Sequence, residues 1–253
     1  MKYLKYICYI LLFGVNSLNA SATNTDKQHQ AEEYYASGHN DEALNIYLSL
    51  SKQGMNADLY YNLANCYYRM DSIPQSLLWY ERAYMLNPGD PDIRYNLQYA
   101  RTKTIDKIVP EEDIFFFRWY KSIINMFSAD NWTIAGIVLF ALCLTSLCIY
   151  FFVSDIRLRK TGFYGACILF IMILCANLFA WQQSESMKRH DRAIIFDSSI
   201  SCKSSPNMAG KELFLLHEGT TVTIIDKSVT NWLQVRLPNG KEGWIPTSSV
   251  EVI

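Results

Sequence analysis

Basic charge is not in excess in this sequence. Its 253 residues carry 23 Lys and Arg against 24 Asp and Glu, which leaves a formal net charge of −1 at pH 7. A protein that binds nucleic acid needs basic side chains to neutralise phosphates. The charge balance therefore argues against nucleic acid as a partner.

Motifs of the common enzyme classes are also absent. The sequence has no H-E-x-x-H, C-x-x-C or G-x-S-x-G and no glycine-rich phosphate loop, and its four histidines fall into no catalytic or ligand spacing. Proton transfer, nucleophilic attack and metal binding each need such groups at suitable positions. We therefore expect no enzymatic activity, no metal centre and no cofactor. A hydrolase that uses Cys66 or Cys202 is the weakest alternative.

Charged residues are missing from two long segments, 132–153 and 162–181. Each is close to the roughly 20 residues that cross a bilayer core about 30 Å thick as a helix. Trp132 and Trp181 lie at outer ends of the two segments, where aromatic rings favour the headgroup level. The pattern predicts two transmembrane helices and excludes a purely soluble protein.

The orientation in the membrane can be inferred from the first residues and from the loop between the spans. Residues 1–22 have the lysines, the apolar run and the A-x-A site of a secretory signal peptide. An uncleaved anchor is the alternative, and either form exports the region after it. The loop 154–161 holds three basic residues, which favours the cytoplasm. Although basic residues also flank the other ends of the spans, the signal predicts an inner-membrane protein with both soluble regions in the periplasm.

A linker with an amphipathic segment, 102–131, precedes the first span. Within it, the polar residues of 113–128 fall on about one third of a helical wheel, and most of the others are apolar. This pattern predicts a helix that lies in the membrane interface and contacts lipid. A helix that caps the N-terminal soluble region is the alternative.

The N-terminal soluble region, 26–101, contains a repeat. The triplet Tyr-Asn-Leu begins at Tyr61 and again at Tyr95, a spacing of 34 residues. Residues 58–91 resemble a tetratricopeptide repeat, on the strength of the signature positions Tyr60, Leu63, Ala64, Tyr67, Ser76, Tyr80, Ala83 and Pro88. An earlier copy at 27–56 is degenerate, and 91–101 is predicted to be a capping helix.

The resemblance implies that the first helices of the repeats line a concave groove. Tyr67 and Tyr80 are expected in the core, whereas core and ligand roles remain open for the groove residues. Because aromatics and Arg are enriched in binding hot spots, the groove is a candidate protein-binding site. Region 26–101 has six basic and ten acidic residues, which favours a neutral or basic partner. The candidate groove residues are Tyr35, Tyr61, Asn65, Tyr68, Arg69, Tyr95 and Tyr99.

The C-terminal soluble region, 193–253, comes after a polar linker at 182–192. It breaks into short β-type runs, with a hairpin turn signal at Pro238-Asn239-Gly240, and about five strands of this length predict a closed or nearly closed barrel. The sequence resembles a bacterial SH3-like domain, which implies binding of cell-wall or peptide ligands. Trp232 and Trp244 are candidate ligand platforms, with a place in the core as the alternative.

Two cysteines, Cys66 and Cys202, lie outside the signal and the spans. One disulfide between them is arithmetically possible. They belong to different domains, and nothing in the sequence brings their Cα atoms within the roughly 7 Å that a disulfide requires.

The whole chain is therefore a multidomain membrane protein with an all-α repeat domain, a two-helix transmembrane hairpin and an all-β SH3-like barrel. This order resembles the BatE-type family of the Bacteroides aerotolerance operon. The resemblance implies a non-enzymatic inner-membrane scaffold in an envelope stress-tolerance complex, whose partners are von Willebrand type A and repeat proteins. A sensor that binds peptidoglycan through the SH3-like domain is the alternative.

Overall fold

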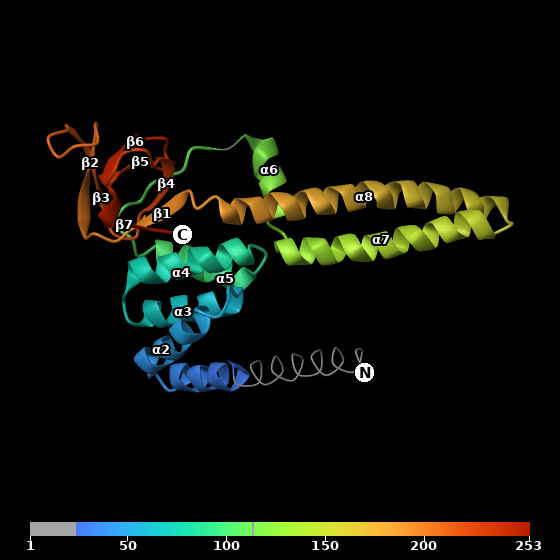
Figure 1. Ribbon diagram of the computed structural model, residues 1–253, viewed down its shortest axis with the longest axis horizontal. Coiled ribbons are helices and arrows are strands. Elements are labelled where there is room, and N and C mark those ends of the chain that lie inside the picture. The colour runs from blue at the N-terminus through green and yellow to red at the C-terminus, as the bar shows by residue number, and fades with distance from the viewer. Residues whose placement is uncertain (1–23, 113) are drawn as a thin grey trace, which may run out of the picture.

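The computed structural model describes residues 24–112 and 114–253, so the expected signal peptide at 1–22 lies outside the described residues. A stack of helices, a long helical hairpin and a curved antiparallel sheet succeed one another along the chain (Figure 1). This architecture confirms the predicted fold class. The stack and the sheet lie together, and the hairpin projects away from both.

The repeat domain consists of consecutive helices. Residues 24–36 are helical. The next four helices are α2 (Asn40–Ser51), α3 (Ala57–Arg69), α4 (Ile73–Leu86) and α5 (Pro91–Arg101). The side chain of Asn56 accepts a hydrogen bond from the Leu59 N–H and caps α3, and Asp90 caps α5 in the same way. The bounds of α5 are those expected for the capping helix.

Small residues let α3 and α4 approach closely. Ser76 Oγ donates to the Ala64 carbonyl at 3.0 Å, and both residues are fully buried. The Tyr80 side chain is buried beside them, whereas Tyr67 is only half-buried. The signature positions of the 34-residue pattern thus form the contact between the two helices of one hairpin.

The two apolar segments form an antiparallel pair, α7 (Ala129–Phe152) and α8 (Ile156–Lys188), both long and apolar enough to span a membrane. A Cβ on Gly162 would lie 2.8 Å from the Ser146 carbonyl oxygen, so glycine is needed for this close approach. The Ser146 hydroxyl donates to the Gly162 carbonyl at 2.9 Å. The polar serine is therefore satisfied within the hairpin.

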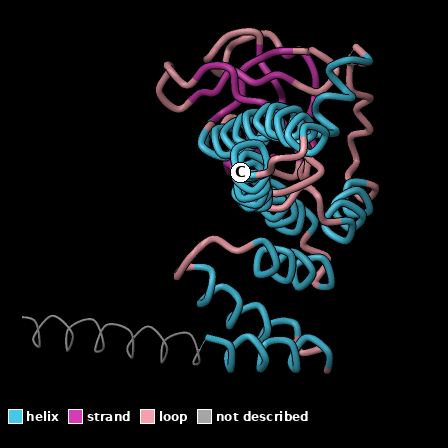
Figure 2. The backbone as a smooth tube through the Cα atoms, turned by 90° about the vertical axis from the view of Figure 1, so that its right-hand side faces the viewer, coloured by secondary structure: helices cyan, strands magenta, loops and turns pink. Residues whose placement is uncertain are grey.

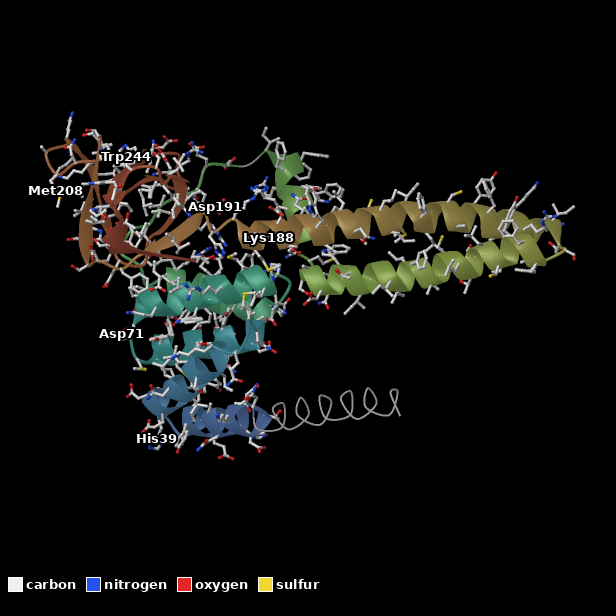
Figure 3. The ribbon with its side chains drawn as sticks, in the orientation of Figure 1. His39, Asp71, Lys188, Asp191, Met208 and Trp244 are labelled. Carbon is white, nitrogen blue, oxygen red and sulfur yellow. The ribbon has the colours of Figure 1, made fainter. Side chains whose placement is uncertain are left out.

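The expected linker at 182–192 differs from the structure. Helix α8 continues without a break to Lys188, and only about one turn of chain separates it from the first strand at Arg192. Figure 3 labels Lys188 and Asp191 on either side of this junction. The polar composition of the segment therefore does not mark a break in the helix.

A short helix, α6 (Phe115–Ile124), precedes the hairpin and lies beside α8 (Figures 1 and 2). Tyr120 Oη donates to Gln182 Oε1 at 2.6 Å, and its ring packs edge-on against Phe179. Phe115, Phe116, Phe117 and Trp119 are exposed. The interfacial position of this helix stays a prediction.

The C-terminal region is one antiparallel sheet. Its strands are β1 (Arg192–Ile195), β2 (Ser199–Lys203), β3 (Glu212–His217), β4 (Thr221–Asp226), β5 (Trp232–Arg236), β6 (Glu242–Pro246) and β7 (Val250–Val252), in the order β3-β2-β6-β5-β4-β1-β7. The expected turn joins β5 to β6, with Gly240 at a φ of 78°. The sequence runs missed β2 and β7, because β2 is polar and β7 is very short.

The repeat domain and the sheet share a core. Strand β1 is buried on both sides: Ala193 and Ile195 face the interior of the barrel, whereas Ile194 packs with Leu77 and Leu78 of α4. Ile253 at the chain end joins the same cluster. Because regions 24–112 and 192–253 contact each other directly, both must lie on the same side of any membrane that α7 and α8 cross.

Candidate binding groove and barrel surface

The seven residues expected in the groove line one hollow of about 490 Å³. Tyr35 comes from the first helix, Tyr61 and Tyr68 from α3, and Tyr95 and Tyr99 from α5. Residues three or four positions apart share a helix face, so the spacing within α3 and within α5 directs these side chains to one side. The structure also places Tyr80 and Asn96 in the lining.

Arg69 is held at one end of the groove. Its guanidinium lies 3.7 Å from the centre of the Tyr35 ring, and its Nη1 donates to the Tyr35 carbonyl at 2.8 Å. Burial raises the pKa of the Tyr35 phenol, and the charge of Arg69 opposes this effect. The phenol therefore stays protonated at neutral pH and can donate a hydrogen bond.

Aromatic faces are open at the other end. The rings of Tyr95 and Tyr99 are parallel, with centroids 6.3 Å apart, and Tyr68 lies 5.8 Å from Tyr99. Tyr95 is 70% exposed and Tyr99 is 47% exposed. Rigid rings with uncovered faces can stack on a ligand at a low cost in side-chain entropy.

Hydrogen bonds fix the base of the groove. Asn96 Nδ2 donates to Tyr61 Oη at 2.5 Å, which links α5 to α3, and Tyr80 Oη donates to Asn65 Oδ1. Tyr80 is thus both a core residue, as expected, and a wall of the groove. Asn96 was missed in the sequence, although its neighbour Tyr95 already placed this part of α5 at the groove.

The charge of the groove differs from that of its domain. Within the described ranges 24–112 and 114–253, its lining has one cation, Arg69, and no carboxylate. The acidic residues counted in region 26–101 therefore lie outside it. The lining presents tyrosine rings, hydroxyls and amides, which suit a neutral polypeptide with aromatic or polar side chains.

Trp232 and Trp244 lie on the outer face of the barrel. Both are half-buried, whereas their neighbours Leu233 and Ile245 point inward and are buried. In the β5–β6 pairing, Trp244 lies opposite Gln234, so the two tryptophans are diagonal neighbours on one face. Figure 3 labels Trp244 in the sheet region. A core role is therefore excluded for both, and a ligand role stays a prediction.

The segment that leaves the repeats is bound to the barrel. Asp106 Oδ2 accepts hydrogen bonds from the His217 N–H at 2.8 Å and from Thr220 Oγ1 at 2.7 Å, and its Oδ1 lies 2.8 Å from His217 Nδ1. Burial acts to raise the pKa of Asp106, but the hydrogen bonds from His217 and Thr220 outweigh it and leave the pKa lowered. Further along, Ile108 packs against the barrel core, and the Glu111 N–H donates to the Pro238 carbonyl at 2.9 Å.

A buried carboxylate joins the two domains. Glu81 of α4 is fully buried and pairs with Arg101 of α5 and with Arg192 of β1, whose Nη1 lies 3.1 Å from Glu81 Oε2. Beside it, Arg82 Nη2 donates to the Val252 carbonyl of β7 at 2.8 Å. Removing Glu81 would leave the two arginines without their shared counter-charge in the interface.

Cys66 and Cys202 are both free and fully buried, each in its own domain. Burial raises the pKa of each thiol to about 11. Because the thiolate is the reactive form, neither residue is a strong nucleophile at neutral pH.

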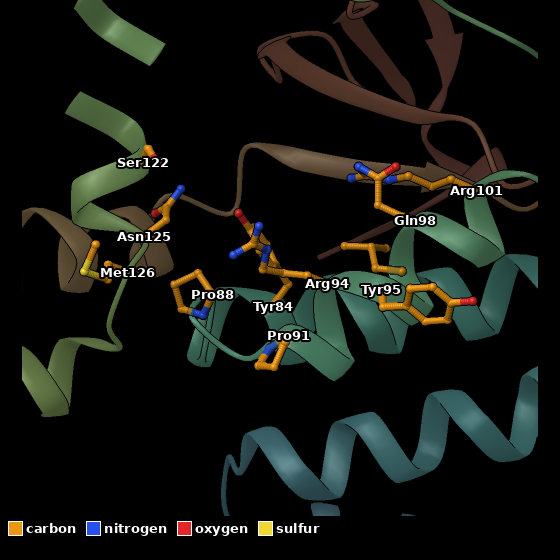
Figure 4. A pocket seen from close by; sticks show the side chains of 11 residues that line it. Tyr84, Pro88, Pro91, Arg94, Tyr95, Gln98, Arg101, Ser122, Asn125 and Met126 are labelled. Carbon is orange, nitrogen blue, oxygen red and sulfur yellow. The ribbon is translucent and has the colours of Figure 1, made fainter. Parts of the chain in front are cut away.

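A further hollow of about 730 Å³ lies between α5 and α6 (Figure 4). Arg94 and Pro91 of α5 line one side, and Ser122, Asn125 and Met126 line the other. No sequence signal indicated it, because it depends on how α6 lies against the repeats.

Comparison with known proteins supports the assignment of the barrel. Residues 198–251 match the family model described as "Bacterial SH3 domain". The helical part gives a similarity to a solved structure titled "Crystal structure of PcrH in complex with the chaperone binding region of PopD". That match has a TM-score of 0.32 and 12% identity, and it covers 66% of this chain and 90% of the other. A structural match this weak supports no conclusion about the fold or the function of this chain. A search of curated proteins gives no match.

Proposed function

We propose that this chain is a non-enzymatic membrane scaffold whose repeat groove binds an extended segment of another envelope protein. The observation that carries the proposal is the convergence of the seven candidate residues from three helices on one hollow. The exposed rings of Tyr95 and Tyr99 and the half-buried hydroxyls supply both apolar area and hydrogen bonds. The raised pKa values of the Cys66 and Cys202 thiols argue against a hydrolase that uses either residue as its nucleophile.

The order of domains supports a more specific proposal. A repeat domain, a membrane hairpin and an SH3-like barrel in one chain are the arrangement of the BatE-type family, so we place the protein in an envelope complex for stress tolerance of the aerotolerance type. Its partners there would be von Willebrand type A and repeat proteins. The shared core of the two soluble domains means that such a partner meets a single rigid surface.

A triple variant tests the groove. Tyr61→Ala, Tyr68→Ala and Tyr95→Ala together remove three rings, and capture of partners from crosslinked native membranes should fall at least about tenfold, since a hot-spot ring contributes about 2 kcal/mol. Tyr34→Ala is the matched control, because Tyr34 lies outside the lining. Unchanged capture by the triple variant, with the repeat domain still folded, would show that the groove is not the binding site.

The periplasmic orientation is tested with an impermeant thiol reagent on intact cells. Single cysteines are placed at the exposed positions Ser37, Thr161 and Ser248. We expect labelling at 37 and 248 and none at 161. Labelling at 161 alone would show the opposite orientation, with both soluble domains in the cytoplasm, and would exclude the cell wall as a ligand.

A peptidoglycan sensor is the second candidate. It is favoured by the bacterial SH3 domain at 198–251 and by the outward position of Trp232 and Trp244. The test is co-sedimentation of the full-length protein in detergent with purified cell wall. Sedimentation that is lost with Trp232→Ala and Trp244→Ala would favour the sensor, and no sedimentation of the wild type would favour the scaffold.

A further inference from the structure

The apolar part of α8 ends in a set of contacts that marks the membrane border. Trp132 Nε1 donates to the Ile124 carbonyl at 3.0 Å, at the turn between α6 and α7. Gln183 is buried there, and its amide nitrogen reaches the Phe127 carbonyl at 2.8 Å in the orientation that satisfies both groups. Tryptophan and polar amides together are typical of the level where acyl chains meet headgroups.

A hollow of about 360 Å³ opens directly beyond this border, between α4, α6 and the end of α8. Three of the described residues that line it are cations, and none of these lining residues is a carboxylate. Apolar side chains occupy another part of the lining, so a cationic and an apolar surface lie side by side. The lining consists of Tyr84, Met85, Pro88, Lys121, Ile124, Asn125, Gln182, Gln183, Ser186, Arg189 and Arg192.

The cations have different surroundings. Arg192 is engaged with the buried Glu81 and forms a fixed part of the wall. Arg189 is exposed, and within the described part of the chain no ion pair involves it. Lys121 approaches the same space from α6. An anion in the hollow would therefore meet Arg189, and Lys121 adds positive charge on the α6 side.

The height of the hollow matches that of a lipid headgroup. Ser186 and Arg189 lie five and eight residues beyond Trp181 along the same stretch of chain at the end of α8, which corresponds to ~7 Å and ~12 Å at 1.5 Å per residue. The headgroup layer extends about 5–8 Å beyond the hydrocarbon on each side, and a long basic side chain can bend back toward it. A phosphate at this level is within reach of Arg189.

We propose that this hollow is a binding site for the headgroup of an anionic phospholipid. Arg189 binds the phosphate, Lys121 adds positive charge to the wall, Ser186 and Asn125 offer hydrogen bonds, and the start of the acyl chains lies against Met85 and Ile124. The exposed rings of α6 enter the same leaflet and keep this helix at the membrane surface. The site requires that α7 and α8 span a bilayer, and it is independent of the ligand of the groove.

The test uses the full-length protein in detergent and two short-chain probes, dioctanoyl phosphatidylglycerol and dioctanoyl phosphatidylcholine. Both have a phosphate, but only the first has a net negative charge. We expect titration followed by native mass spectrometry to show tighter binding of phosphatidylglycerol. Arg189→Gln should weaken it about fivefold, since a basic residue near an anionic lipid contributes about 1 kcal/mol, and adding Lys121→Gln should weaken it further.

Lys188→Gln is the matched control, because Lys188 precedes Arg189 but pairs with Glu185 and does not line the hollow. It should leave the affinity unchanged. Equal affinities for the two lipids, or equal losses with Arg189→Gln and Lys188→Gln, would overturn the proposal. Displacement of the lipid by inorganic phosphate at the same concentration would also overturn it, in favour of a site for a free anion. Melting temperatures of all variants show that the fold is retained.

Discussion

The pairing of Glu81 across the interface gives the sharpest test of how the two soluble domains are joined. Glu81→Gln keeps the shape of the side chain and removes the charge that Arg101 and Arg192 share. Breaking a buried ion pair from one side costs about 3–5 kcal/mol. The lower end applies here, because the side chains of Arg101 and Arg192 are 43% and 33% exposed, so water compensates part of the loss.

A loss of about 3 kcal/mol corresponds to a fall in melting temperature of about 6–12 °C for a chain of this size. Scanning calorimetry or fluorimetry of the full-length protein in detergent measures it. Glu185→Gln is the control: its carboxylate pairs with Lys188 on the helix surface, so we expect a change of about 1–2 °C.

Hydrogen exchange separates the two interpretations of such a shift. If Glu81 holds one cooperative unit together, Glu81→Gln speeds the exchange of amides in β1 and β7 as well as in α4 and α5. Faster exchange confined to the helices, with β1 and β7 unchanged, would refute the reasoning. The repeats and the barrel would then be independent domains that merely touch.

Single contacts give three further predictions. The pKa of Asp106 is lower in the folded protein than its ordinary 3.8, so its contribution to stability is complete above that pH and is lost as the pH falls through the lowered value. Asp106→Asn should therefore reduce the fall in melting temperature that the wild type shows in acid. An unchanged fall in acid would contradict this. The thiols of Cys66 and Cys202 have pKa values raised to about 11, so both should react with a thiol reagent at pH 7 only when the protein unfolds. Peptide mass spectrometry measures this labelling. Rapid labelling of the folded protein would support the hydrolase hypothesis instead. Gly219 has a φ of 79°, and a Cβ there would lie 2.9 Å from Thr104 Cγ2, so Gly219→Ala should lower the free energy of unfolding by about 1–3 kcal/mol, as thermal unfolding can measure. Gly38 has a similar φ of 83° but open space around it, so Gly38→Ala should lower the stability less. Equal losses of stability would show that the contact with Thr104 is unimportant.

The groove could be predicted because repeat periodicity determines direction as well as position. Tyr61 and Tyr68, and likewise Tyr95 and Tyr99, are spaced to share a helix face, and the 34-residue period places the faces of α3 and α5 on the same side. All seven candidates accordingly line one hollow. Their role in binding stays a prediction.

The interface between the domains could not be predicted. Glu81 and Arg192 are 111 residues apart, and neither belongs to a periodic pattern. Ile194 stands in an apolar run, which indicates burial without identifying the surface it packs against. The run is buried on both faces, with Ile195 in the barrel and Ile194 against α4. Only the packed structure distinguishes the two environments.

The prediction of a linker at 182–192 was wrong for a different reason. Residues 182–188 have the composition of a linker, but polar residues with good helix propensity extend a helix that is already nucleated. The hollow with Arg189 was missed for the same reason, since it exists only if the helix continues past the membrane border.

The continuity of α8 limits the positions that the repeat domain and the barrel can take relative to a membrane. At 33 residues the helix is ~50 Å long, and the hydrocarbon core takes up only about 30 Å of that length. The remainder is divided between the two ends: residues 156–161 lie at the loop end of the hairpin, and residues 182–188, ~10 Å of helix, lead to β1. In a bilayer, the groove and the barrel would therefore be held at a nearly constant distance from the lipid surface. Lateral diffusion in the plane of the membrane would be their main remaining motion. A partner anchored in the same bilayer would therefore meet the groove only within a limited range of distances from the membrane surface.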